Sequence, residues 1–153
     1  MGRPRGFDEA IVIASAAELF LSRGYEATSV DDLVTATGVH RGSLYKAFGS
    51  KRGLFLAALQ RWLDQELPAA VAGSGDPIAT DALDLLLVAA LELAPRDPEI
   101  RDLVLRGCQR LSLDHRPAEP VDPACLLGRR LLHRAGAPLT QPAVAEEKHR
   151  WPA

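Results

Sequence analysis

The sequence predicts an all-α fold, and three observations support this prediction. Its 153 residues are 47% hydrophobic but only 5% aromatic, and the apolar residues are largely Leu, Ala and Val, which favours helices over sheets. Apolar residues recur at helical spacing in several segments. Helix-start and helix-stop residues separate these segments. We expect a three-helix helix-turn-helix head followed by a shortened helical C-terminal domain.

Four helices are expected in the first 67 residues, at 8–23, about 28–37, 41–48 and 51–67. Apolar residues at four-residue spacing mark the first helix, and a glycine follows it. Two hydroxyl residues stand at the start of the second, each with an aspartate three positions later, as in a capping box. Glycines end the second and third helices, and Pro68 closes the fourth.

Three further helices are expected at about 77–94, 98–113 and 123–135. Each begins at an Asp-Pro pair, in which Asp caps the helix and Pro is its first residue. The backbone N–H that Pro lacks would be unpaired at this position anyway. The Ala/Gly/Ser segment at 69–75 separates the two groups of helices. Residues 137–153 contain three prolines and no apolar period, so we expect a poorly ordered tail there.

Several functional classes are not supported by the sequence. No apolar stretch approaches the ~20 residues of a membrane span, and the N-terminus lacks the apolar core of a signal peptide. Cys108 and Cys125 form neither a disulfide framework nor a metal-ligand cluster, and we expect both to be packing residues. No nucleophile–base pair or glycine-rich phosphate loop stands out. We therefore expect a cytoplasmic protein that is not an enzyme and needs neither metal nor cofactor.

The basic residues are unevenly distributed along a chain of net charge −2. Residues 1–67 carry eight basic and eight acidic side chains, yet the twelve residues from 41 to 52 contain four basic residues and no acid. Arg3 and Arg5 add a second small basic cluster. A local basic face on a neutral domain suits DNA binding, because phosphate neutralisation depends on where the charges lie.

Residues 28–55 are the most informative part of the chain. Two short helices joined at Gly38-Val39-His40 have the spacing of a helix-turn-helix. Apolar residues on both would fix the angle between them and leave a polar, basic face on the second helix. Such a helix can enter the major groove and present side chains to base edges. The alternative is a helical hairpin whose basic residues are merely solvated, and the spacing alone leaves both open.

Residue identities favour the DNA-binding interpretation. The informative residues are Phe20, Gly24-Tyr25, Thr28-Ser29-Val30-Asp31-Asp32, Gly38-Val39, Gly42-Ser43-Leu44-Tyr45, Phe48 and Ser50-Lys51. In this order and spacing they resemble the TetR family of bacterial regulators, from residue 7 to about 60 without a gap. Residues 90–98 are similar to a segment found early in the effector domain of many members. The resemblance implies a homodimer that places two recognition helices on a palindromic DNA operator, usually represses a promoter, and releases DNA when an effector binds.

The resemblance also implies contacts with the DNA backbone. Thr28 should meet a phosphate through its hydroxyl and nearby backbone amides. Tyr45 should donate its phenol to the backbone, with simple packing as the alternative. Lys51 should add a cation at the start of the fourth helix, where the helix dipole already favours a phosphate. Arg3 and Arg5 resemble the basic arm that many members place in the minor groove, or they are ordinary terminal charges.

Sequence specificity would come from the start of the third helix. The residues concerned are Arg41, Gly42, Ser43 and Lys46. Arg41 could pair with a guanine edge, and Gly42 would let the backbone approach DNA closely. His40 stands where a serine or another good cap is usual, and we expect a weak N-cap rather than a phosphate donor. Arg52 is expected to be a solvated flank.

Three parts are expected: a helix-turn-helix head at 1–55, a helical effector and dimerisation domain at 56–136, and the tail at 137–153. The C-terminal part is shorter than the family normally uses for a ligand pocket and a dimer interface together. Leu86, Ala90 and Val104 could line a pocket for a small apolar effector, but they serve equally well as core. A second hypothesis is a helical interaction or ligand-sequestering module with the same fold and no specific operator.

Overall fold

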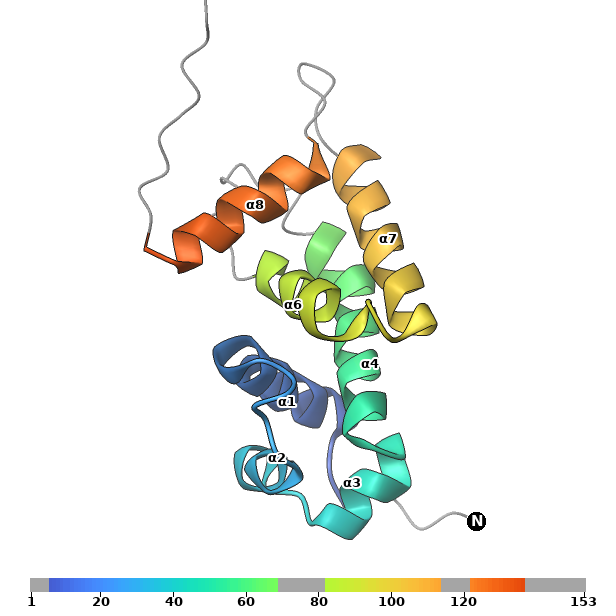
Figure 1. The fold of residues 1–153 in the computed structure, drawn as a ribbon. Coiled ribbons are helices and arrows are strands. Elements are labelled where there is room, and N and C mark those ends of the chain that lie inside the picture. Colours follow the sequence, from blue (N-terminus) through green and yellow to red (C-terminus); the bar gives the residue numbers. More distant parts are fainter. Residues whose placement is uncertain (1–5, 69–81, 114–121, 137–153) are drawn as a thin grey trace, which may run out of the picture.

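The computed structural model describes residues 6–68, 82–113 and 122–136. These residues form helices and no strand, which confirms the all-α prediction. The helices are α1 (Glu9–Arg23), α2 (Val30–Thr37), α3 (Arg41–Phe48), α4 (Lys51–Arg61) with its π-helical continuation η1 (Trp62–Glu66), α6 (Ala82–Val88) with its π-helical continuation η3 (Ala89–Leu93), α7 (Pro98–Leu113) and α8 (Pro123–Arg134). Figure 1 shows α1, α2 and α3 around one end of α4, and α6, α7 and α8 around the other.

Capping residues place the helix boundaries where the sequence predicts them. Asp8 accepts a hydrogen bond from the Ala10 amide at the start of α1, and Ser50 accepts one from Gly53 at the start of α4. Asp122 caps α8 in the same way, with Pro123 at its first position. Four of the predicted features lie outside the described residues. They are the segment boundary at 69–75, the helix start at 77–81, the tail, and the basic cluster of Arg3 and Arg5.

One hydrophobic core runs through both groups of helices. It extends from Val12 and Phe20 of α1, along α4 and η1, to Ile100 of α7 and Leu126 of α8. Helix α4 is continuous across residue 55, where the predicted head ends, and its residues pack on both groups. The division into a head and a C-terminal domain therefore remains a prediction.

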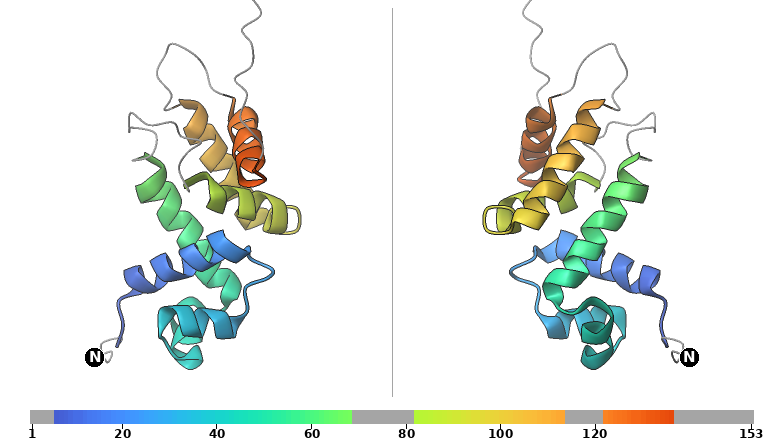
Figure 2. Two further views of the ribbon diagram at one scale, coloured as in Figure 1. Left: turned by 90° about the vertical axis from the view of Figure 1, so that its left-hand side faces the viewer. Right: turned by 90° about the vertical axis from the view of Figure 1, so that its right-hand side faces the viewer.

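Three carboxylates of the C-terminal helices hold the head in place. Glu92 of η3 accepts a hydrogen bond from the backbone N–H of Glu26, in the turn between α1 and α2, at 2.7 Å. Asp97, at the start of α7, receives two hydrogen bonds from the Arg52 guanidinium at 2.5 and 2.9 Å, and Glu99 receives a third at 2.7 Å. The side views show η3 beside the end of α1 (Figure 2). The expectation that Arg52 is a solvated flank is wrong, because its guanidinium is held by the carboxylates of Asp97 and Glu99.

A buried ion pair fixes α8 against α6. The guanidinium of Arg130 donates to both oxygens of Asp84 at 2.7 and 2.8 Å, and the two side chains are only 5% and 9% exposed. A pair this well aligned satisfies both charges, whereas either partner alone would be a buried, uncompensated charge. The pair therefore determines which face of α8 meets the core.

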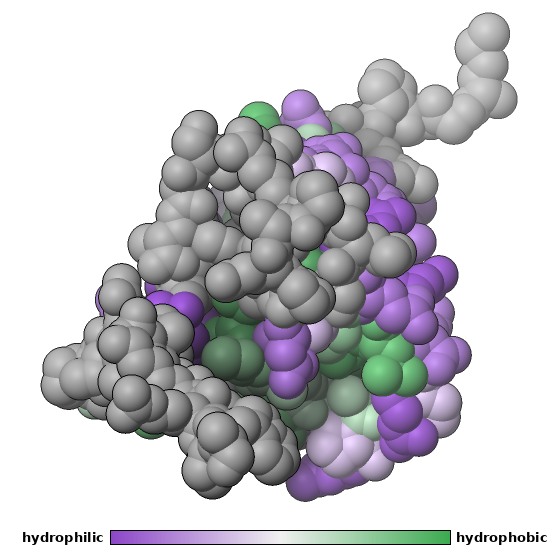
Figure 3. Space-filling model, turned by 90° about the horizontal axis from the view of Figure 1, so that it is seen from above, coloured by the Kyte–Doolittle hydropathy of each residue, from purple (hydrophilic) through white to green (hydrophobic). Residues whose placement is uncertain are grey.

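Several leucines remain on the surface of the C-terminal helices. They are Leu91, Leu105, Leu131 and Leu132, each about half exposed. Figure 3 looks onto the end of the molecule that carries α7 and α8, and it shows hydrophobic atoms among the hydrophilic ones of the described residues. Leu131 and Leu132 are neighbours on α8, and contiguous exposed apolar surface, when it is large, marks sites of protein–protein contact.

The Arg52–Asp97 bridge makes stability depend on pH. The Arg52 guanidinium lowers the pKa of the Asp97 carboxyl from 3.8 to about 2. Because the folded state holds the lower pKa, the stabilisation is present above pH 4 and is lost as the pH falls through about 2. We expect Asp97→Asn to lower the free energy of unfolding by about 1 kcal/mol at pH 7 and by almost nothing at pH 2, measured by urea unfolding.

Asparagine is the informative replacement, because Asp97 also accepts a hydrogen bond from the Ile100 amide and Asn can cap α7 in its place. Asp102→Asn, on an exposed position of the same helix, is the matched control. A loss of stability in Asp97→Asn that stays constant from pH 7 to pH 2 would show that the charge of Asp97 is not responsible.

Candidate nucleic-acid interface

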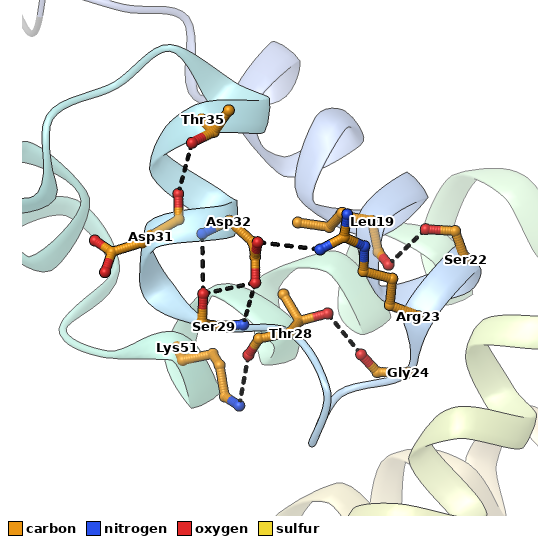
Figure 4. Close-up of polar contacts among 10 residues, drawn as sticks. All are labelled: Leu19, Ser22, Arg23, Gly24, Thr28, Ser29, Asp31, Asp32, Thr35 and Lys51. Atoms are coloured by element: carbon orange, nitrogen blue, oxygen red, sulfur yellow. Dashed lines mark hydrogen bonds and ion pairs between the residues drawn. The ribbon is translucent and has the colours of Figure 1, made fainter.

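The start of α2 is fixed by a capping box. The Ser29 hydroxyl accepts a hydrogen bond from the Asp32 amide at 3.1 Å, and the Asp32 carboxylate accepts one from the Ser29 amide at 2.9 Å (Figure 4). The hydrogen bonds from Ser29 lower the pKa of the Asp32 carboxyl, and Arg23 adds an ion pair at 3.0 Å. The cap of α2 is therefore Ser29 and not Thr28, and the reciprocal bonds satisfy two backbone donors.

The turn between α2 and α3 has the geometry of a helix-turn-helix. Gly38 takes a left-handed conformation with φ 67°, and its N–H closes α2 onto the Val34 carbonyl. Val39 is buried after it, and Leu33 of α2 and Leu44 of α3 are 1% and 5% exposed. A side chain at Gly38 would be strained by the positive φ. The glycine and the three apolar residues together set the angle between the two helices.

The outer face of α3 carries the residues that the sequence predicts for DNA contact. Arg41, Gly42, Ser43, Tyr45 and Lys46 are all exposed on this short helix, while Leu44 between them is buried. Within the part of the chain that the structure describes, the side chains of Ser43, Tyr45 and Lys46 make no hydrogen bond or ion pair. Their polar groups are therefore available to a ligand.

Arg41 is paired within the helix-turn-helix. Its guanidinium donates to the Asp31 carboxylate of α2 at 2.6 Å, and this hydrogen bond raises the pKa of Arg41. Both side chains are largely exposed, so the pair contributes little stability and opens readily. His40 occupies the cap position of α3, but its side chain makes no capping hydrogen bond, so the expected weak cap acts through its backbone alone.

Thr28 does not have the role that the sequence predicts for its hydroxyl. The residue is fully buried, and the hydroxyl donates to the Gly24 carbonyl at 2.7 Å (Figure 4). Its backbone N–H donates to the Tyr25 carbonyl at 3.2 Å. The expected contact between this hydroxyl and a phosphate is corrected, because both donors of Thr28 close the turn between α1 and α2.

Lys51 has a structural role that the sequence does not predict. Its ammonium donates to the carbonyls of Tyr25 and Thr28 at 3.0 and 2.9 Å and lies 4.1 Å from the centre of the Tyr25 ring. These contacts bind the start of α4 to the turn after α1. No phosphate contact of Lys51 is tested by these distances, so its predicted contact with the DNA backbone stays a prediction.

The other predicted residues have mixed outcomes. Leu86 and Val104 are buried in the core and Ala90 packs against it, so a role in effector binding stays a prediction. Cys108 packs on the core, and burial raises the pKa of its thiol, but Cys125 is exposed and is not the packing residue we expected.

The described residues contain no group of His, Cys, Asp and Glu that could hold a metal. They also contain no helix long and apolar enough to cross a membrane.

Comparison with known proteins identifies the family. Residues 12–58 match the model of the bacterial regulatory proteins of the tetR family. The chain is also 34% identical, over 131 residues, to the HTH-type transcriptional regulator YezE of Bacillus subtilis. This match covers 72% of this chain and 68% of YezE. The chain belongs to the TetR family. It is therefore a transcriptional regulator with a DNA-binding helix-turn-helix, as the resemblance implies.

Two other TetR-like relatives match over less than half of this chain. The HTH-type transcriptional repressor ComR of Escherichia coli is 48% identical over 64 residues, and the repressor BdcR of the same organism is 42% identical over 65 residues. These matches cover 42% of this chain in both cases but only 30% of ComR and 33% of BdcR, so the chain spans about a third of these relatives. Among solved structures, a cysteine mutant of the TetR family regulator CifR, in complex with 26-base-pair operator DNA, matches with a TM-score of 0.59 and 26% identity over 89% of this chain and 92% of CifR.

The contacts of Lys51 predict a loss of stability when they are removed from this TetR head. We expect Lys51→Met to lower the free energy of unfolding by about 1–2 kcal/mol, because two carbonyls lose a charged donor while the apolar stem is kept. Urea unfolding measures this change. Lys46→Met is the matched control on the exposed face of α3, with an expected change below about 0.5 kcal/mol. Equal stabilities of the two variants would contradict the structural role of Lys51.

Proposed function

We propose that this chain is a ligand-responsive repressor that acts in the cytoplasm as a homodimer on a palindromic operator. The observation that carries the proposal is the outer face of α3, where Ser43, Tyr45 and Lys46 are exposed and unpartnered beside Arg41. The buried Leu44 anchors this face to the head. ComR and BdcR are named as repressors, and CifR was solved on operator DNA, which supports the same role here.

In this proposal α3 lies in the major groove. Arg41 leaves Asp31 and pairs with a guanine edge, while Ser43 and Lys46 contact neighbouring bases and Gly42 permits a close approach. Tyr45 and Lys51 meet phosphates, which position the head without selecting a sequence. Arg3 and Arg5, outside the described residues, supply the minor-groove arm.

The homodimer is proposed to use the exposed leucines of the C-terminal helices. Leu131 and Leu132 are 47% and 54% exposed on α8, a helix that packs on α6 and α7. Pairing two copies through these helices leaves both α3 helices free for successive major grooves. An operator with two related half-sites is then the expected binding site.

The test is selection of fragments bound from the source genome by the purified protein, at ~150 mM salt, where non-specific binding is weak. We expect enrichment of a two-fold symmetric site. Arg41→Ala should relax discrimination at one base pair of each half-site by about 1–3 kcal/mol. Arg96→Ala, at an exposed position next to α7, is the control and should keep the preference. A folded protein that enriches no site would favour the helical interaction module instead.

The Arg41–Asp31 pair leads to a second prediction. We expect Asp31→Asn to strengthen operator binding by about two- to fivefold, because Arg41 no longer has to leave a carboxylate and one negative charge is removed beside the DNA. Fluorescence anisotropy with the selected operator measures this change. Glu18→Gln, on an exposed position of α1, controls for the change in net charge. Weaker binding by Asp31→Asn would show that the pair helps to orient Arg41 for the base.

A further inference from the structure

A cavity of about 110 Å³ lies between α1, the junction of α4 with η1, and α6. Apolar side chains form most of its wall, among them Ile13 and Ala17 of α1 and Leu85 of α6. Arg61, Trp62 and Glu66, from α4 and η1, supply its polar lining. The cavity is distinct from Leu86, Ala90 and Val104, which do not line it.

Two of the lining residues have hydrogen-bond donors without an acceptor. Arg61 Nε and Trp62 Nε1 are buried, and neither has a partner among the residues that the structure describes. Trp62 as a whole is only 2% exposed. Buried donors in native proteins are almost always paired with protein, water or ligand, so two orphans on consecutive residues require an explanation.

The backbone at these donors is also irregular. Helix α4 changes from α-helical to π-helical turns at Trp62, directly after Arg61, and returns to α-helical geometry at Leu67. Single π-helical turns inside α-helices are rare and frequently lie at functional sites. Glu66, the last residue of the π-helical turn, lines the same cavity but is exposed and forms no ion pair with Arg61 across the described residues. The charge of Arg61 is therefore not neutralised by the carboxylate that lines the same cavity.

We propose that this cavity binds a small organic monocarboxylate. The carboxylate accepts hydrogen bonds from Arg61 and Trp62, and a short hydrocarbon chain packs against Ile13, Ala17 and Leu85. A planar guanidinium is the side chain best suited to a carboxylate, and an indole N–H can only donate. The volume is several times the ~30 Å³ that a water occupies, which fits a compact molecule and not a large polycyclic one.

The position of the cavity connects this site with regulation. Its walls come from α1 of the head and from α6 of the C-terminal helices, so an occupant contacts both groups. A change in operator affinity on binding rests on the proposed function. Binding of the carboxylate itself does not, and it is measured without DNA.

The experiment uses Trp62 as its own reporter. The chain has two tryptophans, so Trp151→Phe leaves Trp62 as the only indole. The full-length Trp151→Phe protein is titrated with pentanoate, and with pentan-1-ol and pentylammonium as chain-matched neutral and cationic probes, while tryptophan emission is recorded. We expect a saturable change with pentanoate, at least about tenfold weaker binding of pentan-1-ol, and none of pentylammonium.

Two variants and one control locate the site. Arg61→Met keeps the apolar stem and should weaken pentanoate by about tenfold or more, and Ala17→Leu should abolish binding by filling the cavity. Arg96→Met should bind as the parent does. The proposal would be overturned by absence of saturation, by equal affinity for pentan-1-ol, or by full pentanoate affinity in a folded Arg61→Met. If Ala17→Leu does not fold, the pentanoate affinity of Arg61→Met alone decides. A failed titration by a protein that still selects its operator overturns only this site, whereas intact titration without operator selection overturns only the proposed function.

Discussion

Three aromatic rings hold α1 of the head against α4, at the turn that receives other long-range contacts of the head. Phe20 of α1 and Phe55 of α4 meet edge to face with centroids 5.1 Å apart, and Tyr25 lies 5.2 Å from Phe55 and 5.8 Å from Phe20. Such geometry gives aromatic pairs their favourable electrostatics in addition to the area they bury. Lys51 then binds the face of Tyr25 and the carbonyls beside it. The cluster therefore fixes the start of α4, which directly follows α3, against α1.

The same turn receives the C-terminal helices. Gly24 has φ 86°, and a side chain there would meet the Glu92 carboxylate, with a Cβ only 2.5 Å from Oε1. Glycine thus allows both the sharp exit from α1 and the close approach of η3. Arg52 provides a second connection, from α4 to the start of α7. Any rotation of the C-terminal helices relative to the head must break or carry these two polar contacts, so η3 and α7 are tied to the head at two separate points.

The sequence predicts the helices well because their boundaries are encoded locally. Ser29 with Asp32, Ser50 before α4 and Asp122-Pro123 are caps whose partners lie within three residues. The exposed face of α3 follows equally from its period and from the buried Leu44. Long-range partners have no such signal: Arg52 lies 45 residues from Asp97. Thr28 and Ser29 are equivalent as patterns, and only the folded turn shows that the Thr28 hydroxyl is used by Gly24. The π-helical turn at Trp62, and with it the cavity, has no sequence signature that we recognise.

The Arg41–Asp31 pair adds a free-energy cost to every DNA contact that Arg41 of the proposed recognition helix makes. In the free protein the guanidinium already has a carboxylate partner, at 2.6 Å. A DNA site that offers Arg41 only a phosphate or a poorly matched base edge replaces the carboxylate with a partner of similar interaction free energy. Binding to such a site therefore gains little free energy from Arg41. A guanine offers two aligned acceptors, worth about 1–3 kcal/mol, which exceeds the 0–1 kcal/mol typical of an exposed ion pair. Because the carboxylate lies on α2, the cost of releasing Arg41 from it is the same at every DNA site, whether the sequence is right or wrong. An acidic residue beside the basic face thus lowers the affinity for every site by the same amount, and the free-energy difference between right and wrong sequences comes from the base contacts of Arg41 alone.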